Sequence, residues 1–344
     1  MKTEITGCSL EELKGVLAGW KEPAFRAKQI FDWLYKKGAV GFDAMSNLPQ
    51  GLRARLKETF TLDSLAVETM QTSKDGTRKF LFRLGDGNFV EAVSIPAEKR
   101  LTGCISSQAG CKYACGFCAS GAAGFKRNLS CAEMVDEVRL LDLDARGQGR
   151  ELSHIVFMGT GEPLDNYVNV FKAVRLLNSP DAFAIGARRI TISTCGIVPG
   201  IERMAKEGLQ VELSISLHAP DDVTRDKIMP VNRVYPMKRL MPVLAAYSRT
   251  TGRQVTFEYI LIKDLNSSLQ NADTLSRIVK GIDGKVNLIP LNPAVKEFRA
   301  ASAEETARFR ERLERNGANV TVRKARGQDI DAACGQLRLR HEKA

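Results

Sequence analysis

Apolar residues in the first part of the chain recur at helical spacing. Ser9 and Glu12 form a capping-box pattern, and apolar positions three or four residues apart follow it. A second apolar stripe begins after Pro23 and ends before Gly38, and a third, shorter stripe follows. We therefore expect residues 1–72 to form a small helical accessory domain.

Two apolar-rich runs predict a connecting β-hairpin at residues 73–96. The runs 79–84 and 89–95 flank a Gly-Asp-Gly-Asn turn sequence. In the second run, Glu91 shares a face with apolar residues. A carboxylate in that position indicates either a functional acid or a cross-strand ion pair with Lys or Arg.

Farther along the chain, short apolar runs alternate with helical patterns. The candidate strands lie at residues 101–106, 154–158, 189–193, 211–217, 254–262 and 285–290. Six β/α units in series predict an α/β fold with a parallel sheet, either doubly wound or curled into a partial (β/α)6 barrel. We expect residues 97–327 to form this core and residues 328–344 a C-terminal segment.

Composition indicates a cytoplasmic protein with a polyanionic partner. No apolar run in the 344 residues reaches the length of a membrane span, and the N-terminus lacks the layout of a signal peptide. Lys and Arg number 51 against 40 Asp and Glu, a net charge of +11. This excess favours RNA or DNA without choosing between them, and a merely soluble basic protein is the alternative.

The cysteines indicate a metal site and not a disulfide framework. Three of the eight lie at Cys111, Cys115 and Cys118, just after the first predicted core strand. Three thiolates can hold three irons of a cubane and leave the fourth open, whereas ferredoxin-type clusters use four cysteines.

Structural zinc is the alternative occupant of this loop. It requires four closed ligands, and the three histidines, His154, His218 and His341, are not spaced to supply the fourth.

The cysteine loop resembles that of a known superfamily. Its sequence, with an aromatic residue before the last cysteine, is similar to the cluster loop of radical S-adenosylmethionine (SAM) enzymes, which implies a [4Fe-4S] cluster and SAM. Wider stretches resemble the RlmN family of rRNA and tRNA adenine-C2 methyltransferases, relatives of the Cfr enzymes. These stretches are residues 106–111, 124–129, 161–163, 193–194, 216–218, 291–293 and 331–337.

The resemblance implies a set of SAM contacts at the ends of successive strands. Glu162 would accept a hydrogen bond from the SAM ammonium, and the others would contact the ribose, carboxylate and adenine. Without the resemblance, a glycine at a strand end is equally well explained by a tight turn, and a serine there is usually a helix cap. The implied residues are Gly161, Glu162, Ser193, Ser216, Leu217, His218 and Asn292.

The resemblance also implies two catalytic cysteines and a base. From spacing alone, Cys104 and Cys334 are small buried hydrophobes. In the family, the residue matching Cys334 takes a methyl group from one SAM, and a second SAM yields a 5′-deoxyadenosyl radical that abstracts hydrogen from the methyl-cysteine. The methylene radical adds to adenine, and Cys104 resolves the adduct through a transient disulfide. Glu91 matches the proton acceptor, a role that burial would favour by raising its pKa.

The implied partners are 23S rRNA, tRNA and an electron donor such as flavodoxin or ferredoxin, with no membrane and a monomeric enzyme. The basic residues Arg26, Lys28, Lys36 and Lys37 either grip RNA or form a solvated face. Two alternatives remain: Cfr-type methylation at adenine C8, and a non-catalytic RNA-binding protein with a structural metal.

Overall fold

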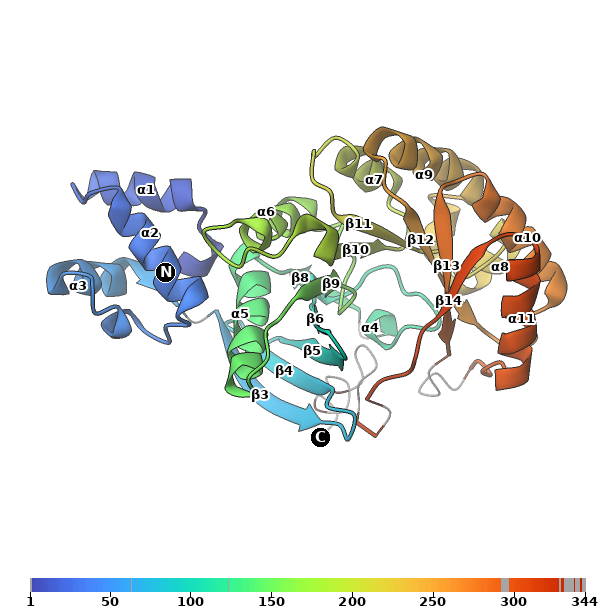
Figure 1. Ribbon diagram of the computed structural model, residues 1–344, viewed down its shortest axis with the longest axis horizontal. Helices are drawn as coiled ribbons and strands as arrows, with labels where there is room; N and C mark the ends of the chain where they lie inside the picture. The colour runs from blue at the N-terminus through green and yellow to red at the C-terminus, as the bar shows by residue number, and fades with distance from the viewer. Residues whose placement is uncertain are drawn as a thin grey trace.

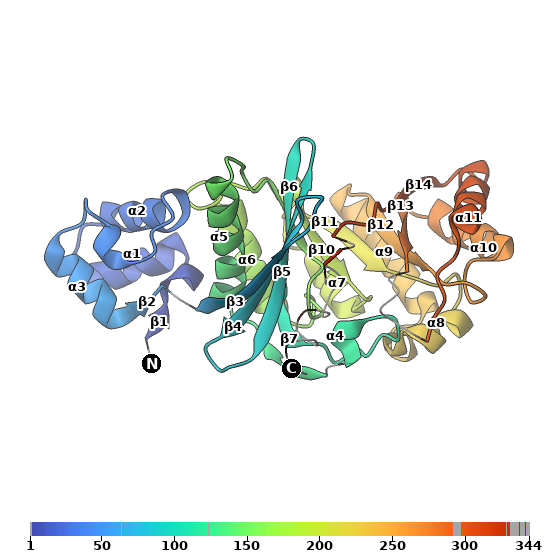
Figure 2. The same ribbon diagram turned by 90° about the horizontal axis from the view of Figure 1, so that it is seen from below.

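The structure, a computed structural model, describes residues 2–62, 64–122, 124–291, 297–327, 329, 330, 337 and 341. The N-terminal elements lie at one end of the molecule and α10 and α11 at the opposite end, with the large sheet between them (Figure 1, Figure 2). In the described part of the chain, no helix is both long and apolar enough to cross a membrane.

The N-terminal unit is helical, as its apolar stripes predict. The Glu12 amide donates to the Ser9 hydroxyl over 3.1 Å, and the Ser9 amide donates to the Glu12 carboxylate over 2.7 Å, which completes the predicted capping box. Its elements are β1 (Thr3–Glu4), α1 (Leu10–Gly19), α2 (Phe25–Phe31), a π-helical turn (Asp32–Lys36), α3 (Gln50–Thr59) and β2 (Phe60–Thr61), with β1 parallel to β2.

A ten-stranded sheet forms the rest of the framework, in the order β14-β13-β12-β11-β10-β9-β6-β5-β4-β3. Its parallel strands are β6 (Arg100–Cys104), β9 (His154–Phe157), β10 (Ile190–Thr194), β11 (Glu212–Ser216), β12 (Val255–Leu261), β13 (Gly284–Pro290) and β14 (Asn319–Val322). The helices of this part are α4 (Ala119–Ala122), α5 (Cys131–Gly147), α6 (Tyr167–Asn178), α7 (Val198–Met204), α8 (Asp222–Ile228), α9 (Met237–Thr251), α10 (Leu269–Lys280) and α11 (Ala303–Arg315).

The strand order decides between the two architectures that the sequence leaves open. From β6 to β14 each new parallel strand is added on the same side of the previous one, whereas a doubly wound sheet reverses direction. Right-handed crossovers then place the helices on one face. The stacking of Tyr259 of β12 on Phe309 of α11, with ring centroids 5.5 Å apart, marks that face. This is the singly wound topology of a partial barrel.

The sheet also curls, which brings its distant strands together. The Gly327 amide, just beyond β14, donates to the Asp75 carboxylate at the opposite edge of the sheet over 3.0 Å. Because β14 and β3 are the two outer strands, this contact requires a curved sheet. The seventh parallel strand, β14, is absent from the predicted set because its four residues, of which only Val320 and Val322 are apolar, form too short a pattern to stand out.

Three antiparallel strands extend the sheet beyond β6. They are β3 (Leu65–Thr72), β4 (Arg78–Leu84) and β5 (Phe89–Ala97). The predicted hairpin forms as β4 and β5. Residues 65–72, grouped by their position in the sequence with the helical segment, instead pair with β4, because an antiparallel partner satisfies the outer edge of that strand.

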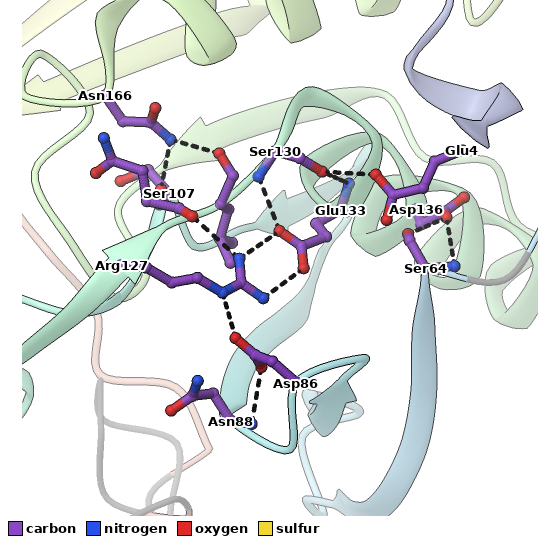
Figure 3. Close-up of polar contacts among 12 residues, drawn as sticks. Glu4, Ser64, Asp86, Asn88, Ser107, Arg127, Ser130, Glu133, Asp136 and Asn166 are labelled. Carbon is purple, nitrogen blue, oxygen red and sulfur yellow. Dashed lines mark hydrogen bonds and ion pairs between the residues drawn. The ribbon is translucent and has the colours of Figure 1, made fainter. Parts of the chain in front are cut away.

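A buried ion pair on α5 joins the N-terminal unit to the sheet. The Arg139 guanidinium donates to the Asp136 carboxylate over 3.0 Å and to the carbonyls of Ala39 and Leu62 over 3.4 and 3.5 Å. The Ser64 amide donates to the same carboxylate over 3.3 Å (Figure 3). One charge pair therefore holds three backbone segments.

We expect Arg139→Met to lower the free energy of unfolding by about 3–5 kcal/mol, because it leaves the Asp136 carboxylate buried without its cation. Urea unfolding of the full chain measures this loss. The double variant Asp136→Leu/Arg139→Met removes both charges and is expected to recover a large part of it. A double variant no more stable than Arg139→Met would contradict this account.

Candidate active site

The cysteine loop is held at its base by a small antiparallel ladder. Strand β7 (Gln108–Gly110) pairs with β8 (Phe125–Asn128), and the Cys111 amide donates to the Gly124 carbonyl over 3.1 Å. Gly110 has φ +83°, and a Cβ atom at this position would lie 1.8 Å from the Gly124 oxygen. Only glycine fits such a close crossing.

A second set of charges fixes this ladder to the sheet. Arg127 of β8 makes a bidentate ion pair with Glu133 of α5, at 2.7 and 2.8 Å, and a further ion pair with Asp86 in the β4–β5 turn (Figure 3). Bidentate pairing fixes the orientation of a guanidinium as well as its position. The base of the cysteine loop is therefore immobilised from two sides.

The three thiols influence one another within the loop. The Cys118 amide donates to the Cys115 carbonyl over 3.0 Å. Burial raises the pKa of the Cys111 thiol to about 11 and raises that of Cys115 as well, and the charge of Cys118 adds to both increases. Bound iron would reverse this repulsion, because a coordinating thiol is deprotonated by its metal.

The thiols of Cys111, Cys115 and Cys118 would each bind one iron of a multi-iron cluster. In the described part of the chain, no three His, Cys, Asp or Glu side chains are gathered tightly enough to hold a single metal ion. A cubane has no such requirement, because each of its cysteine thiolates binds a different iron.

The predicted SAM residues lie at the carboxyl ends of three adjacent strands. Gly161 and Glu162 follow β9, Ser193 lies near the end of β10, and Ser216 ends β11. Gly161 has φ +110°, and a Cβ there would lie 2.6 Å from the Gln108 side chain, so this turn is packed directly against β7. Parallel strands thus bring residues distant in sequence to one edge of the sheet.

The Glu162 carboxylate connects two of these loops. It is buried and accepts hydrogen bonds from the amides of Leu164, at 3.0 Å, and Cys195, at 2.7 Å. Burial raises its pKa, and these donors act in the opposite direction. The side chain therefore orders the loops after β9 and β10, a role that its spacing does not reveal.

His218 links the SAM side of the site to the cysteine loop. Its ring is buried, and Nδ1 accepts a hydrogen bond from the Ile260 amide over 3.1 Å, which places the proton of the neutral ring on Nε2. Burial lowers its pKa to about 3, and the Arg225 charge adds to this effect. The Phe117 ring packs edge-on against it, with centroids 4.6 Å apart. Leu217, before it, is fully buried.

Cys104 and Glu91 lie on one face of the sheet. Val93 pairs directly with Cys104 across β5 and β6, and Glu91 is two residues from Val93 on β5. The Glu91 carboxylate lies 3.0 Å from the Lys79 ammonium, and both groups are buried. The cross-strand ion pair that the sequence left open as an alternative is therefore present.

Two of the predicted site residues, Asn292 and Cys334, lie outside the described residues. Described residues that flank Cys334 in the sequence contact the antiparallel strands. The Lys74 amide donates to Asp329 over 3.0 Å, and the His341 ring packs edge-on against Phe89 with centroids 4.9 Å apart.

Two buried charged side chains at the strand ends were not indicated by sequence. Arg225 of α8 donates to the carbonyls of Leu217 and Cys195, and Glu137 of α5 accepts from the Ser106 amide. Both belong to polar helical segments whose patterns predict exposure. Their partners are distant in sequence, so spacing carries no signal of them.

Comparison with known proteins identifies the family. Residues 105–270 match the Radical SAM superfamily, and residues 3–62 match the Ribosomal RNA large subunit methyltransferase N-terminal domain. The chain is 46% identical to the probable dual-specificity RNA methyltransferase RlmN of Symbiobacterium thermophilum (98% of this chain, 92% of that protein). It is 43% identical to the protein of that name from Spiroplasma citri (99% and 98%). The chain belongs to the RlmN family.

A solved structure supports the same assignment. A radical SAM methyltransferase from Sphaerobacter thermophilus is 45% identical, with a TM-score of 0.94 over 97% of this chain and 98% of that one. The expected fold class, enzyme class and cofactors, a [4Fe-4S] cluster and SAM, are confirmed for the family. These findings favour the RlmN assignment over Cfr-type C8 methylation and over a non-catalytic metal protein.

We expect Gly110→Ala to lose most of its iron while keeping the large sheet, because the added Cβ would displace Gly124 and open the base of the loop. Iron and sulfide analysis of anaerobically reconstituted protein measures the loss, and circular dichroism reports the fold.

Gly87→Ala is the matched control. Gly87 has φ +84° in the β4–β5 turn, but nothing lies within 4 Å of the Cβ that alanine would add. The variant should therefore lose about 1 kcal/mol of unfolding free energy and keep its iron. Equal iron content in the two variants would show that the close crossing is unimportant.

Glu137 is a fully buried carboxylic acid on α5. Its carboxylate accepts from the Ser106 amide over 2.7 Å, and its other oxygen has no hydrogen-bond partner among the described residues. Burial raises its pKa well above the ordinary value of 4.5, so the folded state retains a proton that the unfolded chain releases. The contribution of Glu137 to stability is therefore complete below the ordinary value of 4.5 and is lost as the pH rises above it.

Glu137→Gln keeps an acceptor for Ser106 and removes the titration. Relative to this variant, the wild type should lose about 1.4 kcal/mol of unfolding free energy per pH unit until the raised pKa is reached. Urea unfolding between about pH 5 and about pH 8 measures the difference. Parallel stability curves for the two proteins would refute it.

Proposed function

We propose that this chain methylates C2 of an adenine in 23S rRNA and in tRNA through a methyl-cysteine intermediate, with two SAM molecules consumed per methyl group. The observation that carries the proposal is the placement of Cys104 and Glu91 on one sheet face, with Cys104 at the end of the strand that leads into the cysteine loop. Family membership supplies the reaction class.

The cluster would be held by Cys111, Cys115 and Cys118 and, when bound, supplies the electron that cleaves SAM. The strand ends supply hydroxyl, imidazole and carboxyl groups for the rest of SAM, and His218 can donate only from Nε2. The proposed SAM residues are Gly161, Glu162, Ser193, Ser216, Leu217, His218 and Asn292.

Cys334 is the proposed methyl carrier, whose carbon adds to adenine C2. Glu91 takes the proton from C2 as the adduct gives up one electron, which the oxidised cluster would take back. The Cys104 thiolate then attacks the Cys334 sulfur: a sulfur–sulfur bond forms, the sulfur–carbon bond breaks, and the carbon takes up a proton to become the methyl group. A cellular thiol reductant restores both thiols.

The ion pair with Lys79 suits Glu91 to this role. The ion pair fixes the carboxylate on the sheet face that Cys104 shares.

RNA binding is supported by the net charge of +11. On the N-terminal unit, Lys28 and Lys36 form exposed ion pairs with Asp181 and Asp32, and Lys37 lies over the Trp33 ring at 4.0 Å. Arg26 donates to the Gln29 side chain over 2.8 Å. Exposed pairs of this kind are weak enough for phosphate groups to replace the carboxylates.

The proposal includes a flavodoxin or ferredoxin as electron donor, a monomeric enzyme and a cytoplasmic location. The last of these follows from the chemistry, because reduced cysteines and a low-potential cluster require a reducing compartment.

Variants of the two catalytic cysteines should fail at different steps. Cys334→Ala removes the methyl carrier, so no bond to RNA can form. Cys104→Ala deletes only the resolving thiol, so protein should accumulate covalently attached to RNA. Denaturing gels with nuclease treatment detect the adduct, and mass spectrometry of digested rRNA and tRNA detects 2-methyladenosine in each.

The double variant should behave like Cys334→Ala, because a later step cannot matter once an earlier one is lost. Cys8→Ala is the control, since Cys8 is a half-buried thiol with no proposed role. Normal turnover by Cys104→Ala, or an RNA adduct that persists in the double variant, would disprove these roles.

A further inference from the structure

Arg225 is a fully buried arginine at the edge of the site. Its guanidinium donates to the carbonyls of Leu217 at 3.1 Å, Ser216 at 3.2 Å and Cys195 at 2.7 Å, and to the Asn232 side-chain oxygen at 2.8 Å. The planar fork of donors therefore fixes the loops after β10 and β11 relative to each other.

These acceptors are neutral, so the hydrogen bonds do not cancel the buried charge. Burying a cation is costly unless negative charge lies nearby. Burial lowers the pKa of Arg225, and the thiols of Cys195 and Cys115 and the carboxylates of Asp222 and Asp226 oppose that change. The arginine thus lies within electrostatic reach of a proposed cluster ligand, Cys115.

The helix that carries Arg225 also contacts the cysteine loop directly. The Gly116 amide, next to Cys115, donates to the carbonyl of Ile228 at the end of α8 over 2.9 Å. On the other side of the loop, Phe117 packs against His218. Helix α8 therefore joins the strand ends at Ser216 and Leu217 to the loop of thiols.

We propose that Arg225 is a positioning residue that couples the cluster loop to the SAM pocket and whose buried charge favours the reduced cluster. The inference rests on the proposed cluster and SAM residues. Reduction adds one negative charge to the cluster, and a fixed cation in a low-dielectric interior stabilises that charge. The same side chain holds the Ser216 and Leu217 carbonyls in place for SAM.

The test compares three variants of the full chain, each reconstituted anaerobically with iron and sulfide. Arg225→Met removes the charge and the fork, and Arg225→Lys keeps the charge but not the fork. Lys227→Met is the matched control, because Lys227 lies exposed on the same helix. The measurements are iron per chain, the cluster midpoint potential by electron paramagnetic resonance titration, the SAM dissociation constant and thermal unfolding.

We expect Arg225→Met to have a more negative midpoint potential than the wild type and to bind SAM about tenfold or more weakly. Arg225→Lys should keep a midpoint potential close to that of the wild type while losing SAM affinity to a similar extent. Lys227→Met should match the wild type in both. A purely structural role would not separate the potential from the affinity in this way.

An unchanged midpoint potential in folded, iron-loaded Arg225→Met would overturn the inference. If Arg225→Met does not fold, the test depends on Arg225→Lys. A SAM affinity of Arg225→Lys within twofold of the wild type would then overturn the inference. Wild-type protein that holds no cluster and binds no SAM would instead refute the proposed function itself, and the inference with it.

Discussion

Backbone groups at the carboxyl edge of the parallel strands must find hydrogen-bond partners away from water, and this requirement organises the site. Loops after β9, β10 and β11 leave the sheet side by side, where no further strand can pair with them. Two buried charged side chains supply these partners. Glu162 accepts hydrogen bonds from amides of two loops, and Arg225 donates to carbonyls of two loops. Their opposite charges match the opposite polarity of the groups that they satisfy.

This arrangement explains why the loops are ordered by ionisable and not by neutral residues. Charged donors and acceptors form stronger hydrogen bonds than neutral ones, and one carboxylate or guanidinium can serve several partners. The side chains also leave a residual field at the site. Arg225 lowers and Glu162 raises the pKa of the Cys115 thiol, so the side chains that hold the loops also act on the electrostatics of the cysteine loop.

Local features of the site were predictable from sequence, and long-range features were not. The cysteine spacing and the capping box at Ser9 are encoded over a few neighbouring residues. The ion pair of Glu91 was predicted only as one of two possibilities, because its partner depends on strand register. Arg225 and β14 gave no clear signal. Arg225 is buried only by tertiary contacts, and β14 is a four-residue edge strand that pairs with β13.

The position of Cys104 also bears on the order of events in the proposed reaction. A thiol whose pKa burial raises to about 11 is almost wholly protonated near neutrality and so is a poor nucleophile. Resolution then requires a proton acceptor close to the thiol. Glu91, on the same face of the sheet, becomes available again once it has released the proton from adenine, so one carboxylate can serve both steps in turn.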